Sequence, residues 1–241
     1  MTPERPATIS IVIPAYNEEE TIETLLHRLR QVEFDGLRTE VIVVDDHSTD
    51  QTLERLRRFG GGIRLIQHAR NQGKGAAVKT GFEAARGDVL VIQDADLEYD
   101  PHDIPRVVEP IVQGHADAVL GSRFLWQKPK FFTRHGSPFF SHYIGNRLII
   151  WLTNWLYGFH ATDYEGCYKA FRADVIRATP VGADGFEFDN ELICKLLRRK
   201  RRISEVPIRY NPRRYQEGKK IRWQHGVRMV WTILKWRVWP L

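Results

Sequence analysis

The chain has 241 residues, of which 42% are hydrophobic and 27% are charged. This balance excludes a wholly disordered chain, and the length allows one large α/β domain or one domain with an appendage. The formal net charge of +6 favours an anionic partner, such as a nucleotide, a phospholipid surface or a nucleic acid. The cysteines, Cys167 and Cys194, fit neither a disulfide framework nor a metal-ligand spacing, so we expect a reducing cytoplasm.

The chain shows no obvious membrane-spanning segment. Residues 1–10 lack the apolar core of a signal peptide. No uninterrupted apolar stretch reaches the roughly 20 residues that a spanning helix needs. The nearest candidate, 139–159, is broken by Ser141, His142, Asn146, Arg147 and Asn154. We therefore expect no transmembrane helix.

Apolar runs alternate with helical patterns through the first half of the chain. In the first predicted helix, Ile22, Leu25, Leu26 and Leu29 form one apolar face. Strands are predicted over 8–13, 40–44, 63–66, 88–92 and 117–120, and helices over 18–32, 51–59, 74–86 and 103–113. This alternation predicts a parallel sheet covered by helices.

The pattern changes after Gly121. A loop over 124–137 precedes an aromatic, weakly amphipathic helix or helix pair over 139–157. Further strands are predicted over 167–171 and 202–206, and further helices over 187–197 and 223–238.

Several carboxylates follow the predicted strand 88–92. Gln93 leads into Asp94, Ala95 and Asp96, with Glu98 just beyond. Ligands of open parallel sheets bind beyond the carboxyl ends of the strands, and acidic oxygens there suit a hard divalent cation that holds a phosphate-bearing ligand. An isolated Asp-x-Asp more often caps a turn or a helix. The accompanying motifs favour chemistry on a nucleotide or a similar diphosphate.

Three further motifs lie at the ends of predicted strands or the start of a helix. In segment 14–18, Tyr16 offers a flat ring for a base. Asp45 and Asp46 end the second strand, where a carboxylate can accept hydrogen bonds from a base or ribose. Segment 71–75 lacks the full phosphate-loop pattern, but Lys74 lies near a helix N-terminus that favours anions. Ordinary turn and cap chemistry is the alternative for each motif.

Together with Gly121-Ser122-Arg123, these motifs resemble those of the family 2 glycosyltransferases in order and approximate spacing. More narrowly, residues 8–228 resemble the dolichyl- and polyprenyl-phosphate sugar synthases. The resemblance implies an α/β GT-A fold, with a Rossmann-like, mainly parallel sheet and C-terminal amphipathic helices. It also implies a single domain over 1–241, with a nucleotide-sugar-binding half at 8–122 and an acceptor-binding half at 123–241.

The resemblance implies an inverting, metal-dependent transfer. A hexose would move from GDP-mannose or UDP-glucose to a polyprenyl or dolichyl phosphate, with Mg²⁺ or Mn²⁺ as cofactor. The metal would lie at Asp94, Asp96 and Glu98, the last of which stands where related synthases have a glutamine. The implied nucleotide-sugar site comprises Pro14, Ala15, Tyr16, Glu18, Val44, Asp45, Asp46, Lys74, Asp94, Ala95, Asp96, Arg214 and Lys220.

The implied catalytic residues are Asp96, Arg123 and Arg134. A phosphate acceptor is already an anionic nucleophile, so the arginines would align it while Arg214 or Lys220 neutralises the leaving diphosphate. The basic stretch 213–220 resembles the mobile C-terminal loop of the family, although Gly218 and Lys219 depart from its pattern. His47 also departs, because glycine or asparagine is more common there.

A saccharide hydroxyl is the alternative acceptor, and it would require a general base. Asp163, Asp189 and Glu191 are the candidates for that base; surface charge or helix capping is the structural alternative for Asp163 and Glu191. A third reading is a non-enzymatic basic module that binds nucleic acid or membrane through 198–202. That patch is more typical of a solvated helix end.

Tryptophans lie among basic residues in 139–159 and 223–239, a composition that favours a membrane interface. Packing of these rings onto the domain is the alternative. We expect a cytoplasmic protein, peripheral on the cytoplasmic face of the membrane. The expected partners are a nucleotide-sugar, a polyprenyl phosphate and an anionic membrane surface, with no nucleic acid; the sequence does not decide the oligomeric state.

Overall fold

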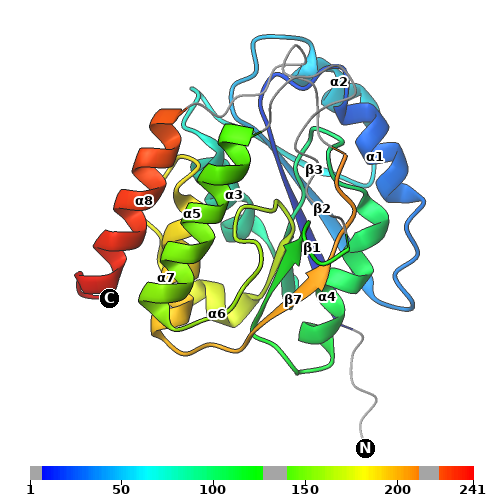
Figure 1. Cartoon of the computed structure of the whole chain (residues 1–241). Coiled ribbons are helices and arrows are strands. Elements are labelled where there is room, and N and C mark those ends of the chain that lie inside the picture. The colour runs from blue at the N-terminus through cyan, green and yellow to red at the C-terminus, as the bar shows by residue number, and fades with distance from the viewer. Residues whose placement is uncertain (1–6, 127–139, 212–222) are drawn as a thin grey trace, which may run out of the picture.

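A computed structural model describes residues 7–126, 140–211 and 223–241. Within these residues, one seven-stranded sheet has the order β3-β2-β1-β4-β6-β5-β7 (Figure 1). Its strands are β1 (Thr8–Ala15), β2 (Arg38–Asp45), β3 (Arg64–Gln67), β4 (Val89–Ile92), β5 (Ala118–Ser122), β6 (Lys169–Arg172) and β7 (Ile203–Pro207).

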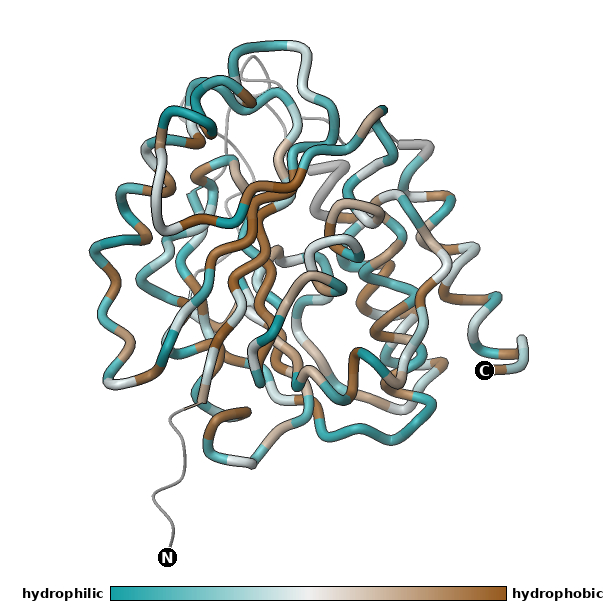
Figure 2. The backbone as a smooth tube through the Cα atoms, turned by 180° about the vertical axis from the view of Figure 1, so that it is seen from behind, coloured by the Kyte–Doolittle hydropathy of each residue, from teal (hydrophilic) through white to brown (hydrophobic). Residues whose placement is uncertain are grey.

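The sheet is mainly parallel, as predicted. β1 pairs in parallel with β2 on one side and with β4 on the other. β6 runs antiparallel to β4 and β5, whereas β5 and β7 are parallel. The central strands form the apolar middle of the molecule in Figure 2 and are covered on both faces, which explains their nearly continuous apolar sequences.

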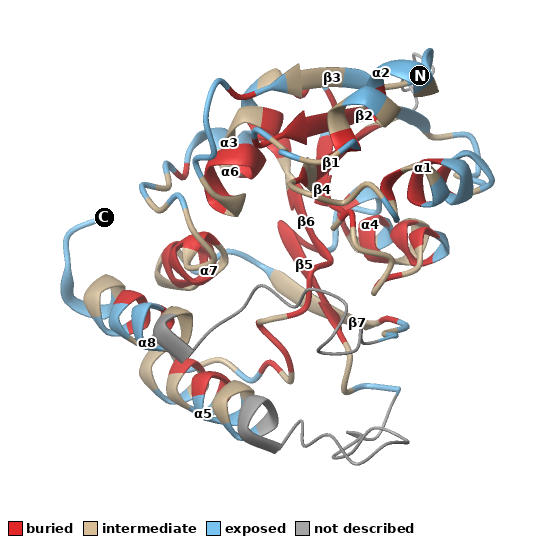
Figure 3. Cartoon of the chain, turned by 90° about the horizontal axis from the view of Figure 1, so that it is seen from above, coloured by how far each residue is buried: buried red, intermediate tan, exposed pale blue. Residues whose placement is uncertain are grey.

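Helices cover both faces of the sheet (Figure 3). α1 (Ile22–Arg30) and α4 (Ile104–Val112) lie on one face, and α3 (Lys74–Ala84), α6 (Ala173–Arg177) and α7 (Phe188–Arg198) lie on the other. α5 (Phe140–Tyr157) and α8 (Trp223–Val238) pack outside α7. The remaining helices are α2 (Thr52–Phe59) and a 3-10 turn, η1 (Pro101–Asp103).

The predicted elements are present, with shifted ends. The helix predicted over 18–32 is shorter, because residues 16–21 form a turn before α1. The segment 139–157 forms the single helix α5. The sequence analysis missed α6, whose five residues are too few to show a helical period. Most of the predicted loop 124–137 lies outside the described residues.

No helix in the described parts of the chain combines the length and the apolar character that crossing a bilayer requires.

Candidate active site

The strand-end motifs converge at one edge of the sheet. The parallel register places Ala15 of β1 beside Asp45 of β2, and Asp45 beside Gln67 of β3. Gln93, which follows β4, donates its backbone N–H to Val12 of β1 at 2.9 Å. The carboxyl ends of β1, β2, β3 and β4 therefore lie side by side, at the position where open parallel sheets bind ligands.

The turn after β1 is tied to the turn after β2. Asn17 donates its backbone N–H to Ser48 Oγ at 3.0 Å, and its Oδ1 accepts from the Thr49 N–H at 2.8 Å. These bonds hold Tyr16, which is half-buried, beside the end of β2. His47 has φ +63°, in the left-handed region that glycine and asparagine adopt more readily than other residues.

Asp45 presents an unsatisfied carboxylate oxygen. Its side chain is fully buried, and Oδ2 accepts from the Ser48 N–H at 3.3 Å. Oδ1 has no hydrogen-bond partner among the described residues. A buried acceptor without a partner costs free energy, so this oxygen fits an N–H or O–H donor supplied by a ligand.

In contrast, both carboxylate oxygens of Asp46 have hydrogen-bond partners within the protein. Its Oδ1 lies 2.7 Å from His68 Nδ1 and accepts from the Gln72 N–H at 2.9 Å. Its Oδ2 accepts from the Gly73 N–H at 2.7 Å. Both oxygens thus hold the segment that leads into α3, and the nucleoside contact that the resemblance implies for Asp46 stays a prediction.

Asp94 forms a partly buried ion pair with Lys74, whose Nζ lies 2.7 Å from Oδ1 and 2.9 Å from Oδ2. Burial acts to raise the pKa of the Asp94 carboxyl, but the Lys74 ammonium outweighs it and the pKa falls below its ordinary value. Burial likewise acts to lower the pKa of Lys74, and the Asp94 charge raises it overall. Both groups are therefore charged at neutral pH.

This pairing bears on the metal site that the resemblance implies. No group of three or more His, Cys, Asp or Glu side chains within the described residues is arranged to hold a metal ion. Asp94, Asp96 and Glu98 thus do not form a ready-made cluster, because Asp94 faces Lys74. Mg²⁺ needs only one or two carboxylates together with phosphate oxygens and water, so Asp96 and Glu98 still fit such an ion.

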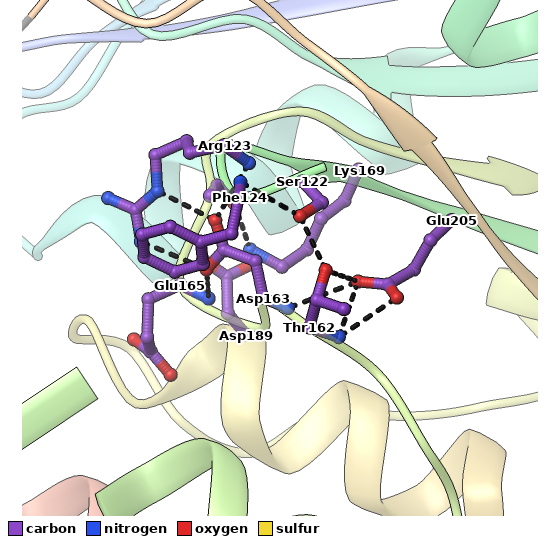
Figure 4. Close-up of polar contacts among 10 residues, drawn as sticks. Ser122, Arg123, Phe124, Thr162, Asp163, Glu165, Lys169, Asp189 and Glu205 are labelled. Atoms are coloured by element: carbon purple, nitrogen blue, oxygen red, sulfur yellow. Dashed lines mark hydrogen bonds and ion pairs between the residues drawn. The ribbon is translucent and has the colours of Figure 1, made fainter. Parts of the chain in front are cut away.

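Arg123, directly after β5, forms a bidentate pair with Asp163 (Figure 4). Nε and Nη2 donate to the two carboxylate oxygens at 2.7 and 2.9 Å. Burial acts to raise the pKa of Asp163, but the Arg123 charge holds it below its ordinary value. Asp163 is therefore not a surface charge, which corrects the structural alternative considered for it.

A family model described as "Glycosyl transferase family 2" matches residues 10–179. The chain belongs to glycosyl transferase family 2. A dolichol-phosphate mannosyltransferase of Pyrococcus furiosus is 30% identical, over 95% of this chain and 64% of that protein. An undecaprenyl-phosphate 4-deoxy-4-formamido-L-arabinose transferase of Edwardsiella ictaluri is also 30% identical, over 88% of this chain and 62% of that protein. The family 2 chain thus spans less than two thirds of the length of these relatives.

A relative of similar length is the UDP-N-acetylglucosamine–dolichyl-phosphate N-acetylglucosaminyltransferase of Methanococcus voltae, 27% identical over 94% of both chains. Two solved structures of Mycobacterium tuberculosis glucosyl-3-phosphoglycerate synthase cover 98% of this chain. One, with Mn²⁺, UDP and phosphoglyceric acid, has a TM-score of 0.74 at 24% identity over 80% of that chain. The other has a TM-score of 0.72 at 26% identity over 82%. The GT-A fold is confirmed.

The family 2 site contains charged residues that the sequence analysis missed. Lys169 is almost fully buried, donates to the Gly166 carbonyl and lies 3.3 Å from Asp189 Oδ2. Glu165 accepts from Asn190 Nδ2 at 2.9 Å. Burial raises the pKa of Glu165, with help from the nearby charges of Asp189 and Asp163. In the sequence, these buried charged residues are indicated only by a lysine, Lys169, at the start of the otherwise largely apolar strand β6.

Tyr210 was also missed. It pairs through an isolated β-bridge with Tyr99, and its hydroxyl hydrogen-bonds with the Glu98 side chain. The Arg123 guanidinium lies 5.2 Å from the centre of its ring. This tyrosine follows β7 and connects the acidic turn with the Arg123–Asp163 pair; nothing in its local sequence marks it.

Glu191 and the basic patch have structural partners. The Glu191 carboxylate accepts from Lys195 Nζ at 2.6 Å and from the Gly182 N–H at 2.8 Å. Arg199 donates to Thr179 Oγ1 at 2.8 Å, and Arg202 to Asp117 at 3.1 Å. Glu191 is 4% exposed and so is not a surface charge. Lys200, Arg201 and Arg202 are exposed just after α7, as expected of a solvated helix end.

Arg134, Arg214 and Lys220, with Gly218 and Lys219, lie outside the described residues. The predicted loop 213–220 lies there as well. Their assigned roles remain predictions.

Proposed function

We propose that this family 2 protein is an inverting hexosyltransferase that transfers sugar from a nucleotide-sugar to a polyprenyl phosphate. The observation that carries the proposal is the meeting of two features at one sheet edge. Asp45 offers an unsatisfied buried oxygen, and Arg123 is held by Asp163 across from the acidic turn. We propose that residues 8–122 bind the donor and residues 123–241 bind the acceptor, within one domain.

The donor half suits a nucleoside diphosphate. Asp45 Oδ1 accepts an N–H of the base, and the half-buried Tyr16 ring stacks against it. Pro14, Ala15, Glu18 and Val44 shape the same strand ends. Lys74, at the N-terminus of α3, is charged and positioned to face a diphosphate. This assignment agrees with the name of the Methanococcus voltae relative, which specifies UDP-N-acetylglucosamine together with dolichyl phosphate.

Asp96 and Glu98, with the backbone of Ala95 between the two aspartates, would hold Mg²⁺ or Mn²⁺. Such an ion, when bound, neutralises charge on the leaving diphosphate. Asp94 would contribute indirectly, through the charge of Lys74.

The acceptor needs orientation more than activation. A phosphate monoester carries about −1.5 to −2 charges at neutral pH, so it can attack without a protein base. The Asp163 carboxylate accepts hydrogen bonds from Nε and Nη2 of Arg123 and thereby fixes the orientation of the guanidinium. The rest of the guanidinium can then align the acceptor phosphate.

An apolar cavity of about 520 Å³ supports a lipid acceptor. It is lined by α5, including Arg147, Trp151 and Trp155, and by His160 and Thr162. Thr162 precedes Asp163 and shares a 2.6 Å hydrogen bond with Ser122, which precedes Arg123. The cavity therefore adjoins the proposed phosphate position, and its apolar and cationic lining suits a prenyl chain near its phosphate.

The outer helices support contact with an anionic membrane from its cytoplasmic face. Trp151 and Trp155 are 60% and 68% exposed and stack at 5.8 Å, and Trp231 on α8 is 66% exposed. Exposed arginines, Arg147 and Arg228, lie on the same helices. The packing alternative is supported for two rings, because Tyr157 and Trp236 pack against the small cluster that contains Ile149 and Ile233.

The donor half is tested by thermal unfolding with UDP-glucose and GDP-mannose, each with Mn²⁺. A ligand that binds the native state raises the unfolding midpoint. We expect one donor to raise it only when metal is present. No rise with any nucleotide-sugar would contradict the proposal.

A saccharide hydroxyl is the second candidate acceptor, and Asp189 is the observation that favours it. Its Oδ1 is buried without a hydrogen-bond partner among the described residues, as expected of a general base before substrate binds. The variant Asp189→Asn separates the two candidates. It abolishes turnover if Asp189 is the base, whereas a phosphate acceptor retains measurable transfer.

A further inference from the structure

The Asp46 carboxylate accepts hydrogen bonds from several residues of the segment between β3 and α3. Three donors reach its oxygens: His68 Nδ1 at 2.7 Å, the Gln72 N–H at 2.9 Å and the Gly73 N–H at 2.7 Å. The Asp46 carbonyl also accepts from Asn71 Nδ2 at 3.3 Å. The side chain is almost fully buried, so these donors replace water rather than compete with it.

His68 connects this carboxylate to α3. Its ring is 6% exposed, and its backbone N–H donates to the Asp45 carbonyl at 2.9 Å. Nδ1 faces Asp46, and Nε2 lies 2.9 Å from Thr80 Oγ1 on α3. Because Asp46 accepts only, Nδ1 is the protonated nitrogen of the pair.

The segment that these hydrogen bonds hold determines where Lys74 lies. Gly73 has φ +101°, and a Cβ there would lie 2.6 Å from the Asp184 carbonyl oxygen, so the backbone has little room to shift. Lys74 follows directly and reaches Asp94. A change in the position of Gly73 would therefore move the ammonium that faces the donor site.

We propose that His68 and Asp46 form a buried positioning pair that fixes Lys74 for the donor diphosphate, and that Asp46 does not itself contact the nucleoside. This inference rests on the proposed function for the role of Lys74. His68 acts through Asp46 and the amides of Gln72 and Gly73, without touching the substrate.

Two nearly isosteric variants separate the two sides of the imidazole. His68→Asn retains an N–H near the position of Nδ1, whereas His68→Gln retains a polar group only toward Thr80. Thr80→Val is the matched control for the Thr80 contact. Thermal unfolding checks that each variant is folded.

The first readout is hydrogen exchange of the free protein at Gln72 and Gly73. We expect faster exchange at both amides in His68→Gln, and near-wild-type exchange in His68→Asn and Thr80→Val. Exchange in His68→Gln that equals wild type would overturn the positioning pair, whether or not the protein binds nucleotides.

The second readout is the affinity for UDP and GDP compared with uridine and guanosine, measured by ligand-observed NMR. His68→Gln and Lys74→Met should each weaken binding of the nucleoside diphosphate by about tenfold, with the nucleoside unchanged, because one charge-assisted contact is misplaced or lost. Asp46→Asn should give the same result as His68→Gln: weaker binding of the nucleoside diphosphate and unchanged binding of the nucleoside. If Asp46→Asn weakens the binding of the nucleoside as much as that of the nucleoside diphosphate, then Asp46 contacts the nucleoside, and the inference is overturned. If wild type binds neither nucleotide, the proposed function fails, while the exchange data still decide the pair.

Discussion

At the residue scale, two opposite-charge pairs organise the charged side chains of this site. Asp94 faces Lys74, and Asp163 faces Arg123. Pairing keeps all four groups ionised although each is at least partly buried. The sequence motifs located Asp94 and Arg123, but their partners come from segments 20 and 40 residues away and could not be assigned by spacing alone.

Asp163→Asn should destabilise the protein in a pH-dependent manner. At neutral pH the loss leaves Arg123 buried without its counter-charge, which costs about 3–5 kcal/mol. The pKa of Asp163 is lower in the folded protein than in the unfolded chain, so its contribution is present above about pH 3.9 and disappears as the pH falls through the folded value. Urea unfolding at several pH values should show the difference from wild type narrowing in acid.

A matched control for this measurement is Glu54→Gln, which breaks an exposed pair with Arg58 on α2. Exposed pairs contribute about 0–1 kcal/mol. A difference between wild type and Asp163→Asn that stays constant from neutral to acid pH would contradict the buried-pair account.

Asp96→Asn should weaken metal-dependent nucleotide binding and reduce transfer by on the order of 100-fold or more. The reason is the loss of one anionic oxygen from a site with few carboxylates to spare. Calorimetric titration of Mn²⁺ in the presence of nucleotide measures the binding, and Glu54→Gln, in the exposed pair on α2, is the control. Near-normal turnover of folded Asp96→Asn at saturating metal would remove Asp96 from the metal site.

At the element scale, the start of α3 packs closely against the segment that leads into α7. A Cβ at Gly75 would lie 2.7 Å from Phe188 Cβ on α7 and 2.8 Å from the Asp184 carbonyl carbon. Gly75→Ala should therefore destabilise the protein by about 1–3 kcal/mol. Gly145, on α5, has nothing within 4 Å of an added Cβ, so Gly145→Ala should stabilise it by about 0.5–1 kcal/mol. Denaturant unfolding measures both; equal effects would contradict the packing between α3 and α7.

The helices α5 and α8 should bind membranes reversibly. Each basic contact near an anionic surface contributes about 1 kcal/mol and is screened by salt. Liposome flotation should show binding to anionic vesicles at low salt, and the double variant Arg147→Gln/Arg228→Gln should weaken it. Arg57→Gln/Arg58→Gln removes the same charge from α2 and should not. Equal loss in both double variants would show that net charge, rather than these helices, determines binding.

At the scale of the whole molecule, the sequence predicted the fold class and nearly every element, because buried strands and amphipathic helices have clear periods. Strand order was less accessible. β6 enters antiparallel between β4 and β5, and no local pattern indicates that choice. The donor motifs were visible because strand ends concentrate polar residues. The roles of His68, Lys169 and Tyr210 were not, because each depends on contacts between segments far apart in the chain.

The most direct test of the account is transfer of radiolabelled sugar into organic solvent. The donor is the nucleotide-sugar that stabilises the protein, and the acceptors are polyprenyl phosphate, the corresponding polyprenol and an oligosaccharide, each with Mn²⁺. The account predicts labelled lipid with polyprenyl phosphate, none with polyprenol, and loss of product in Asp96→Asn. Label that appears in the oligosaccharide and never in the lipid phosphate would contradict it.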